Sequence, residues 1–489
     1  MLTLILISGL VPVIAGIAVH GMHAEKKKLA SALVLGAIAV SLASNLAICF
    51  NDLRGTAVAF ALTAELRIVF RVDAPACFFS LLFTLAFALT AVYALSYFQE
   101  DGRKPQFDCF YLLSFGALML LCYSGNLITM YICFEMVTLM SMPLVLHDKT
   151  KESVDAALKY LIYSVGGAFL GFIGVVYLSL NTSTDLFTPG GTLVVGVAGS
   201  NVFLTVVLLM FIGFGAKCGL FPLHNWLPTA HPVAPAPASA LLSGIITKSG
   251  VVAVYRILYD VVGTEAFFGT WAHKTWLSLI LLTILLGSFM AVVQKNFKKR
   301  LAFSSVSQIS YVLLGLAMMN GQAMAGAVLQ ISSHAVIKIG LFLTAGAAIR
   351  LLGVHDVDEM DGAGYRMPVT MWCYTVCALG LVGVPPTGGF VAKWYLAEGA
   401  LNSGLGALSV IAPAVLIVSA ILTAYYLLSV TVSAFFPSDK TKTFERVKEP
   451  AAMVIPLIVL AVLTVAIGIF SGWFVNFSAG WLTAADAIL

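Results

Sequence analysis

Five charged residues lie in the middle of long apolar stretches of this sequence: Lys217, Lys248, Lys338, Lys393 and Glu135. If these stretches cross a membrane, each ionisable group at mid-bilayer costs about 2.5–3.5 kcal/mol on insertion scales. In a purely static role, each lysine would pair with a carbonyl or a carboxylate and fix the packing. The four lysines, which we call the lysine row, lie on four separate stretches, and Glu135 is the one acid in a comparable position. This pattern favours a functional role for the lysine row.

Lysine is the basic residue best suited to releasing a proton inside a protein. Burial disfavours its charged form, and its compact ammonium group can give up the proton, whereas arginine stays protonated. The sequence places no arginine in the middle of an apolar stretch. A carboxylate within about 4–6 Å of a buried lysine favours its charged form, so an acid that meets one of these lysines would modulate it. The pattern therefore predicts proton transfer rather than permanent ion pairing.

Three histidines are candidates for weaker roles. His334 and Lys338 are spaced i, i+4 and so share one helical face. A histidine that titrates near neutral pH could relay a proton there, and a structural histidine is equally compatible with the pattern. His224 and His231 flank a short loop, and several prolines lie in it and just after it. This pattern favours a role in anchoring at the membrane surface over a metal site.

The eight cysteines do not suggest a cofactor. All lie in or beside apolar stretches, and none forms a Cys-x-x-Cys pair. We interpret them as small buried hydrophobic residues, and expect no iron–sulfur cluster, haem or zinc. Any electron transfer linked to this chain would then take place in partner subunits.

The composition is that of a membrane protein. Of the 489 residues, 60% are hydrophobic and only 10% charged, against about 25% charged in soluble domains. The mean hydropathy is +0.99, so lipid must be the solvent for most of the surface. The net charge of +4 is small and lies in short loops, which argues against nucleic-acid binding.

A span of about 20 apolar residues crosses a bilayer as a helix. That rule predicts an all-α polytopic protein with about 14 spans. The approximate ranges are 2–20, 29–50, 75–97, 109–123, 126–146, 154–180, 201–222, 237–259, 275–294, 301–320, 322–349, 368–399, 409–436 and 450–474.

Two of these spans carry helix-breaking residues near a lysine. Gly213, Gly219 and Pro222 surround Lys217, and residues 383–389, with two prolines and three glycines, precede Lys393. We therefore expect helices 7 and 12 to be broken beside protein or a wet cavity. Paired breaks five spans apart predict two inverted five-helix repeats with an ion site at each break. The expected division is 1–108 (helices 1–3), 109–260 (helices 4–8), 275–436 (helices 9–13) and 450–489 (helix 14).

The basic residues test this count of spans. Of the 27 lysines and arginines, 18 fall in loops on one side of the membrane, and four form the lysine row. The other side has five: Arg54, Arg67, Arg71, Arg256 and Lys274. Since loops rich in basic residues face the cytoplasm, we expect a multi-pass protein of the cell inner (plasma) membrane with both termini outside.

Several segments resemble one family of ion-translocating proteins. Residues 216–235 are similar to the signature of the antiporter-like subunits of respiratory complex I, Mrp-type sodium/proton antiporters and membrane-bound hydrogenases. So are Phe134-Glu135-Met136, Thr247-Lys248-Ser249-Gly250, residues 304–308 and residues 383–386. The resemblance covers nearly the whole chain.

The resemblance implies the 14-helix fold with inverted repeats and a path for protons. Glu135 and Lys217 match the acid–lysine pair of the family, Lys248 the central lysine of helix 8, and His334 the relay on helix 11. Lys393 matches the ionisable position of helix 12, where some members have glutamate. Some members have histidine at the position of Gln308, and the amide here cannot titrate.

The resemblance also implies partners. They would be other membrane subunits of a complex I-like, hydrogenase or Mrp assembly, with protons, and sodium as a second candidate ion, as the cargo. The chain itself would hold no redox centre and would pump within an oxidoreductase complex or an antiporter. Two alternatives are a stand-alone secondary transporter and a scaffold subunit with a non-conducting path.

Overall fold

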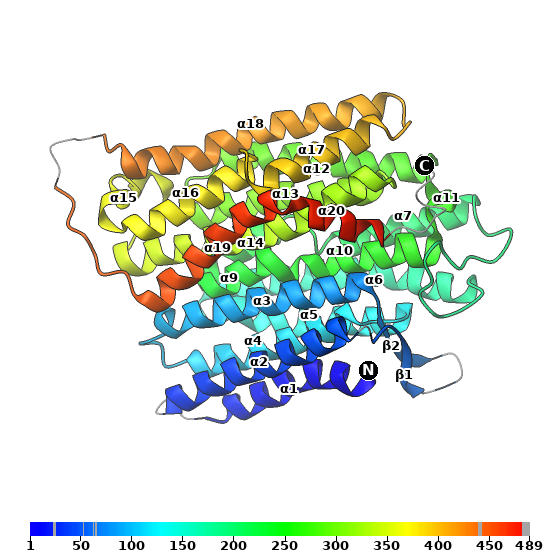
Figure 1. The fold of residues 1–489 in the computed structure, drawn as a ribbon, viewed down its shortest axis with the longest axis horizontal. Helices are drawn as coiled ribbons and strands as arrows, with labels where there is room; N and C mark the ends of the chain where they lie inside the picture. The colour runs from blue at the N-terminus through cyan, green and yellow to red at the C-terminus, as the bar shows by residue number, and fades with distance from the viewer. Residues whose placement is uncertain (23–25, 52, 62, 64–65, 439–442, 482–489) are drawn as a thin grey trace.

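The computed structural model describes residues 1–22, 26–51, 53–61, 63, 66–438 and 443–481, and its helices lie side by side in one bundle (Figure 1). Within these ranges, twelve helical segments are long and apolar enough to cross a membrane. They are α1 (Leu2–His20), α2 (Lys27–Phe50), α3 (Ala74–Tyr97), α4 (Lys104–Cys122), α5 (Leu127–Val145), α6 (Lys151–Leu180), the run Ala236–Val262, α12 (Trp271–Val293), α13 (Phe297–Ala317), α14 (Gly321–Leu352), α18 (Ala407–Phe435) and α19 (Ala451–Ile469).

The two remaining predicted spans are broken helices. α7 (Asn201–Gly215) stops before Lys217, and the chain resumes as α8 (Leu227–Val233) after an irregular segment. α16 (Pro368–Val382) is separated from α17 (Gly388–Leu401) by residues 383–387. Each break has a glycine at positive φ, Gly219 at +75° and Gly383 at +94°, and prolines that cannot donate a backbone hydrogen bond. The predicted all-α membrane fold with interrupted helices 7 and 12 is confirmed.

The helical run Ala236–Val262 is irregular in a way that the sequence did not predict. It consists of α9 (Ala236–Leu241), α10 (Lys248–Ile257) and two π-helical turns, η2 (Leu242–Ile246) and η3 (Leu258–Val262). A π turn shifts the hydrogen-bond register and is often found at functional sites. Lys248 begins α10, and one residue separates it from the end of the first of these turns.

A β-hairpin lies between the second and third spans, where the sequence predicted only a loop. β1 (Gly55–Ala61) pairs antiparallel with β2 (Arg67–Val72), and Gly125 donates to the carbonyl of Val69. Met1 lies beside Gly55, and Tyr255 donates to the carbonyl of Trp481. The beginning of α1 and Trp481, which follows α20 (Ser471–Ala479), are therefore at the same end of the bundle as the hairpin.

Short elements complete the described chain. They are α11 (Thr264–Phe267), the 3₁₀ turn η4 (Val357–Glu359) and α15 (Ala363–Arg366). Polar caps start many of the helices: the side chain of Asn126 accepts from the N–H of Thr129, and that of Asn320 accepts from the N–H of Ala323.

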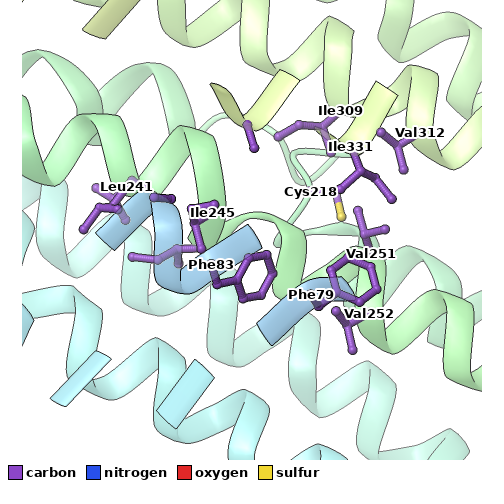
Figure 2. Close-up of a cluster of buried hydrophobic side chains, with 14 of the residues drawn as sticks. Phe79, Phe83, Cys218, Leu241, Ile245, Val251, Val252, Ile309, Val312 and Ile331 are labelled. Carbon is purple, nitrogen blue, oxygen red and sulfur yellow. The ribbon is translucent and has the colours of Figure 1, made fainter. Parts of the chain in front are cut away.

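The apolar core joins helices that are distant in sequence. Figure 2 shows buried apolar side chains of α3, α10, α13 and α14 close to one another. The labelled residues from these helices are Phe79, Phe83, Val251, Val252, Ile309, Val312 and Ile331. α14 packs against α13, α16, α17 and α19, so it is the central helix of the second half.

A buried ion network fixes the N-terminal helices to the run Ala236–Val262. Arg256 donates to Asp73 at 2.6 and 2.9 Å and to Asp260 at 2.7 Å, and Arg71 contacts Asp73 at 3.1 Å. Burial by itself would raise the pKa of Asp73, but Arg256 and Arg71 hold it below its usual value. Our count of basic residues placed Arg256 in a loop. The structure instead buries it inside the helical run, where two carboxylates make the burial tolerable.

Glycine allows α6 and α7 to approach closely. A Cβ at Gly167 would lie 2.6 Å from the carbonyl oxygen of Gly213, whereas a Cβ at the adjacent Gly166 would meet nothing within 4 Å. The backbones of the two helices thus come into contact one turn before Lys217, as small residues permit in membrane proteins.

We therefore predict that Gly167→Ala destabilises the protein and Gly166→Ala does not. Overpacking typically costs about 1–3 kcal/mol, while alanine on an open helix face is neutral or slightly favourable. The measurement is thermal unfolding of the detergent-solubilised protein. Equal melting temperatures for the two variants would show that this helix crossing is not tight.

Candidate functional site

Lys217 lies in the break after α7 and is held by hydroxyl groups. Its Nζ donates to Tyr160 OH at 2.5 Å and to Thr138 Oγ1 at 2.9 Å, with Ser164 Oγ at 3.5 Å. The amine also lies 4.4 Å from the centre of the Tyr160 ring. The side chain is 1% exposed. α5, α6 and α7 therefore meet at this amine.

Glu135 is near Lys217 but not paired with it. It lies on α5, one turn before Thr138, and the two charges are close enough to interact electrostatically. The ion pairs of at most 4 Å among the described residues do not include this one. Glu135 Oε1 is buried and accepts no hydrogen bond from the described part of the chain. The amine thus bonds to hydroxyls and also experiences the charge of a carboxylate that it does not contact.

Lys248 and His334 are in direct contact. Lys248 Nζ lies 2.6 Å from His334 Nδ1 and donates to the carbonyl of Ser243 at 2.8 Å. That carbonyl belongs to the π turn η2, and Thr247 Oγ1 also donates to it. Both side chains are fully buried, and His334 Nε2 has no partner in the described ranges. A proton shared between Nζ and Nδ1 could leave from Nε2, because either ring nitrogen can hold it.

Lys338 lies one turn beyond His334 on α14. Its Nζ donates to Ser304 Oγ at 2.6 Å and to the carbonyl of Leu301 at 2.9 Å, both on α13. The side chain is fully buried, and its charge interacts with those of Lys248 and His334. The structure therefore brings three predicted residues, Lys248, His334 and Lys338, into one cluster, and no carboxylate of the described residues is hydrogen-bonded to any of them.

A polar stripe on α13 leads from this cluster to Lys393. Ser304, Gln308 and Tyr311 are spaced i, i+4 and i+7. Gln308 Oε1 accepts from Gln330 at 3.0 Å, and Tyr311 has Lys393 Nζ at 5.7 Å from its ring centre. Gln308 therefore belongs to this polar stripe through the hydrogen bonds of its side-chain amide.

Lys393 caps the first half of a broken helix. Its Nζ donates to the carbonyls of Leu381 and, at 2.6 Å, Val382, which end α16. The break leaves such carbonyls without partners within the helix, and a cation stabilises the negative end of the helix dipole. Lys393, like Glu135, is only partly buried in this chain, while the amines between them are fully buried.

The other predicted residues fall outside these contacts. His224 is half-buried against Phe221, and His231 is fully buried and stacks on Phe342. Within the described ranges, no three side chains of His, Cys, Asp or Glu come together as metal ligands would. The site thus consists of amines, hydroxyls, backbone carbonyls and an imidazole, with the Glu135 carboxylate near one end.

Comparisons with known proteins identify the family. Residues 124–439, more than half of the chain, match the family described as NADH:quinone oxidoreductase/Mrp antiporter, TM. The chain belongs to this family. The chain is 36% identical over 405 residues to NADH-quinone oxidoreductase subunit N of Desulforudis audaxviator (strain MP104C), with 79% of each chain covered. The resemblance drawn from the sequence is confirmed.

Two further proteins are similar along most of their length. One component of the Na(+)/H(+) antiporter of Alkalihalophilus pseudofirmus is 28% identical over 427 residues, covering 87% of this chain and 84% of that one. A chain of the Mrp complex from Dietzia sp. DQ12-45-1b superposes with a TM-score of 0.84 at 22% identity, covering 98% and 97% of the two chains. The fold of this family member is thus shared almost end to end.

Sequence reasoning missed the groups that hold the amines. Thr138, Tyr160 and Tyr311 carry no charge and stand in ordinary apolar helices, so nothing marked them. The spacing of two of them from predicted site positions gave a faint signal: Thr138 is three residues after the acid Glu135, and Tyr311 is three after the amide Gln308.

We predict that Tyr160→Phe changes the position of the Lys217 amine. The variant keeps the ring but removes a hydrogen bond to a charged group, worth about 1.5–3 kcal/mol. The amine should then turn toward Glu135, which a high-resolution map would show. Ion translocation, if this family member performs it, should fall about tenfold, since 1.4 kcal/mol is a factor of ten.

The matched control is Tyr163→Phe on the same helix. The Tyr163 hydroxyl makes no hydrogen bond to the described residues, so this change should leave both the amine and the rate unaltered. An unmoved Lys217 amine in Tyr160→Phe would mean that Tyr160 does not position it.

Proposed function

We propose that this chain is an ion-translocating subunit of a multisubunit membrane complex, which moves protons, or exchanges protons for sodium. The observation that carries the proposal is the contact of Lys248 Nζ with His334 Nδ1 at 2.6 Å, deep inside the bundle. Neighbouring amines and an imidazole without a bound carboxylate exchange a proton more readily than a saturated ion pair, because no fixed charge holds it.

In this proposal the residues act in sequence along the lysine row. Glu135 controls whether Lys217 holds its proton, Lys248 and His334 pass a proton between the two halves, and Lys338 receives it. Lys393 is the terminal group, reached along Ser304, Gln308 and Tyr311. The same roles support the division into 1–108, 109–260, 275–436 and 450–489, with Lys248 and His334 at the junction of the two central units.

The partial exposure of Glu135 and Lys393 supports a place among other subunits. Charged groups at the two flanks of a lone protein would face lipid at considerable cost. Neighbouring membrane subunits would cover them and continue the path, and the similar chain from Dietzia sp. DQ12-45-1b is itself part of a complex. The partners are therefore membrane subunits, with any redox centre outside this chain.

We also propose the orientation that the basic residues favour. Both termini would face outward from the cell inner membrane, with the hairpin β1–β2 on the outer side. The loops at the opposite end of the bundle carry most of the lysines and arginines and would face the cytoplasm.

Glu135→Gln and Lys217→Ala should each lower ion translocation at least tenfold while leaving assembly intact. The first removes the carboxylate charge and the second removes the amine that it modulates. The measurement is proton movement into membrane vesicles containing the assembled complex, with Glu152→Gln and Lys151→Ala, both exposed on α6, as controls. If both test variants move protons at the parental rate, the chain is a scaffold subunit with a non-conducting path.

A second experiment separates a subunit from a stand-alone carrier. The chain purified alone and placed in liposomes should support no ion exchange, because its flanking groups then lack their neighbours. Exchange at the rate of the full complex would favour the stand-alone transporter.

A further inference from the structure

An apolar cavity lies between α3, α14, α19 and α20 and opens at the surface of the bundle. It has a volume of about 400 Å³, and Leu82 on α3, Val336 on α14 and Leu463 on α19 are among its lining residues. Phe50 and Trp473 also line it, and they are 81% and 60% exposed. A cavity of this size with an apolar lining is typical of a ligand site. Its opening among exposed apolar side chains gives access to molecules of the bilayer.

A polar cavity adjoins the apolar one at the hairpin end of the bundle. It has a volume of about 560 Å³, and Thr56, Arg71 and Asp260 are among its lining residues. The residues that line both cavities lie beside the hairpin and at the start of α3: Arg54, Val72, Asp73 and Ala74. The two cavities therefore meet at these residues and form the two parts of one amphipathic site.

Tryptophan side chains lie in both parts of this site. Trp473 on α20 lines the apolar cavity, and Trp481, which follows α20, lines the polar one. Tryptophan is enriched where the hydrocarbon of a bilayer meets the headgroups, because its ring is apolar and its N–H is polar. The boundary between the two cavities is thus at the depth expected for the first polar groups of a lipid.

Arginine supplies positive charge at this boundary. Among the described residues, the lining of the polar cavity and the groups bound to it include three arginines and two aspartates: Arg54, Arg71, Arg256, Asp73 and Asp260. Arg71 contacts Asp73 at 3.1 Å and also donates to the carbonyl of Phe187. A guanidinium has five N–H donors, so Arg54 and Arg71 can bind an anionic oxygen in addition to their partners within the chain.

An amphipathic anion accounts for both parts of the site. An inorganic anion would occupy the polar cavity alone, and a neutral hydrocarbon would occupy the apolar cavity alone. A phospholipid with a negatively charged headgroup matches both, because an acyl chain gains from burial among apolar side chains while its phosphate binds arginine.

α14 forms the inner wall of the apolar cavity. Ser332 and Val336, spaced i and i+4, both line it. His334 and Lys338 follow these two residues by two positions each, which places them on the opposite face of the helix. An acyl chain in the cavity therefore packs on the side of α14 that faces away from the lysine row.

We propose that the two cavities together bind one anionic phospholipid of the surrounding bilayer. One acyl chain occupies the apolar cavity between α3, α14 and α19, and the phosphate lies beside Arg54 and Arg71. The lipid is held without covalent chemistry, and it connects the hairpin and α3 to helices of the second half of the chain. Lipid binding at this site does not depend on ion translocation.

Native cysteines report on the apolar cavity in the unmodified protein. Cys49 and Cys77 line it and are partly exposed, whereas the other six cysteines are buried. In the full chain purified in detergent, N-ethylmaleimide should label these two cysteines, as peptide mass spectrometry would show. Saturating dioleoyl phosphatidylglycerol should slow their labelling about tenfold, because bound lipid excludes the reagent. Dioleoyl phosphatidylcholine and inorganic phosphate should slow it less than about twofold. A cysteine at the fully exposed position of Val195, introduced as Val195→Cys, should be labelled at the same rate in every condition.

Variants in each part of the site separate recognition of the headgroup from recognition of the chain. Arg54→Gln should weaken phosphatidylglycerol binding about tenfold, because a hydrogen bond to a charged group is lost. It should leave the weaker binding of phosphatidylcholine unchanged. Leu82→Trp places a larger side chain in the apolar cavity and should reduce the binding of both lipids. Native mass spectrometry of the purified chain measures the bound lipid.

Matched controls come from the same elements. Arg67→Gln removes an arginine of β2 that pairs with Asp185 and lines neither cavity. Leu89→Trp enlarges a partly buried residue of α3 that also lines neither cavity. Both controls should bind phosphatidylglycerol as the parent chain does.

Each contrary result would overturn a stated part of the proposal. Equal protection of the two cysteines by both lipids, or parental binding in Arg54→Gln, would show that the site does not select an anionic headgroup. Equal protection by inorganic phosphate would show that no acyl chain is needed. Unchanged labelling with phosphatidylglycerol would exclude a lipid from the apolar cavity. If Leu82→Trp fails to fold, the labelling of the unmodified chain decides alone.

Discussion

The structure depends on holding lysine amines inside an apolar bundle without pairing them with carboxylates. An unpaired buried charge is unfavourable by several kcal/mol, so each amine of the lysine row must find polar partners. Here these are hydroxyls for Lys217, a carbonyl and an imidazole for Lys248, a hydroxyl and a carbonyl for Lys338, and two carbonyls for Lys393. Neutral partners tolerate both protonation states of lysine, which a carboxylate in full contact would not.

Helix irregularities supply the carbonyl partners of Lys248 and Lys393, whereas Lys338 uses the Leu301 carbonyl within α13. A regular helix uses its carbonyls internally, so free ones arise only at ends, breaks and π turns. Lys393 takes the last carbonyls of α16, and Lys248 takes a carbonyl of the turn η2. Glycine and proline at the breaks therefore do more than bend the chain, since they create the polar sites that the amines occupy.

Elsewhere the chain does use saturated ion pairs, and the contrast is informative. Arg256 is bound by Asp73 and Asp260, and Lys104 contacts Asp108 at 2.5 Å. Both sets lie near helix ends: the Arg256 network joins the start of α3 to the run Ala236–Val262, and the Lys104–Asp108 pair lies within the first turns of α4. Strong pairing thus serves assembly at the ends of the bundle, and weaker contacts with neutral groups dominate at its centre, where protons would have to move.

The sequence alone determined the spans, the two breaks and the charged members of the site, because hydropathy, glycine, proline and mid-span charges are local properties. Only the tertiary structure decided which groups meet. Lys248 and His334 are 86 residues apart, and Lys217 and Thr138 are 79 apart, so no spacing rule joins them. The hydroxyls of Thr138 and Tyr160, the π turns, the hairpin and the buried position of Arg256 also required the fold. Uncharged polar residues cost little in any helix, and their role is therefore set by the neighbours that packing brings to them.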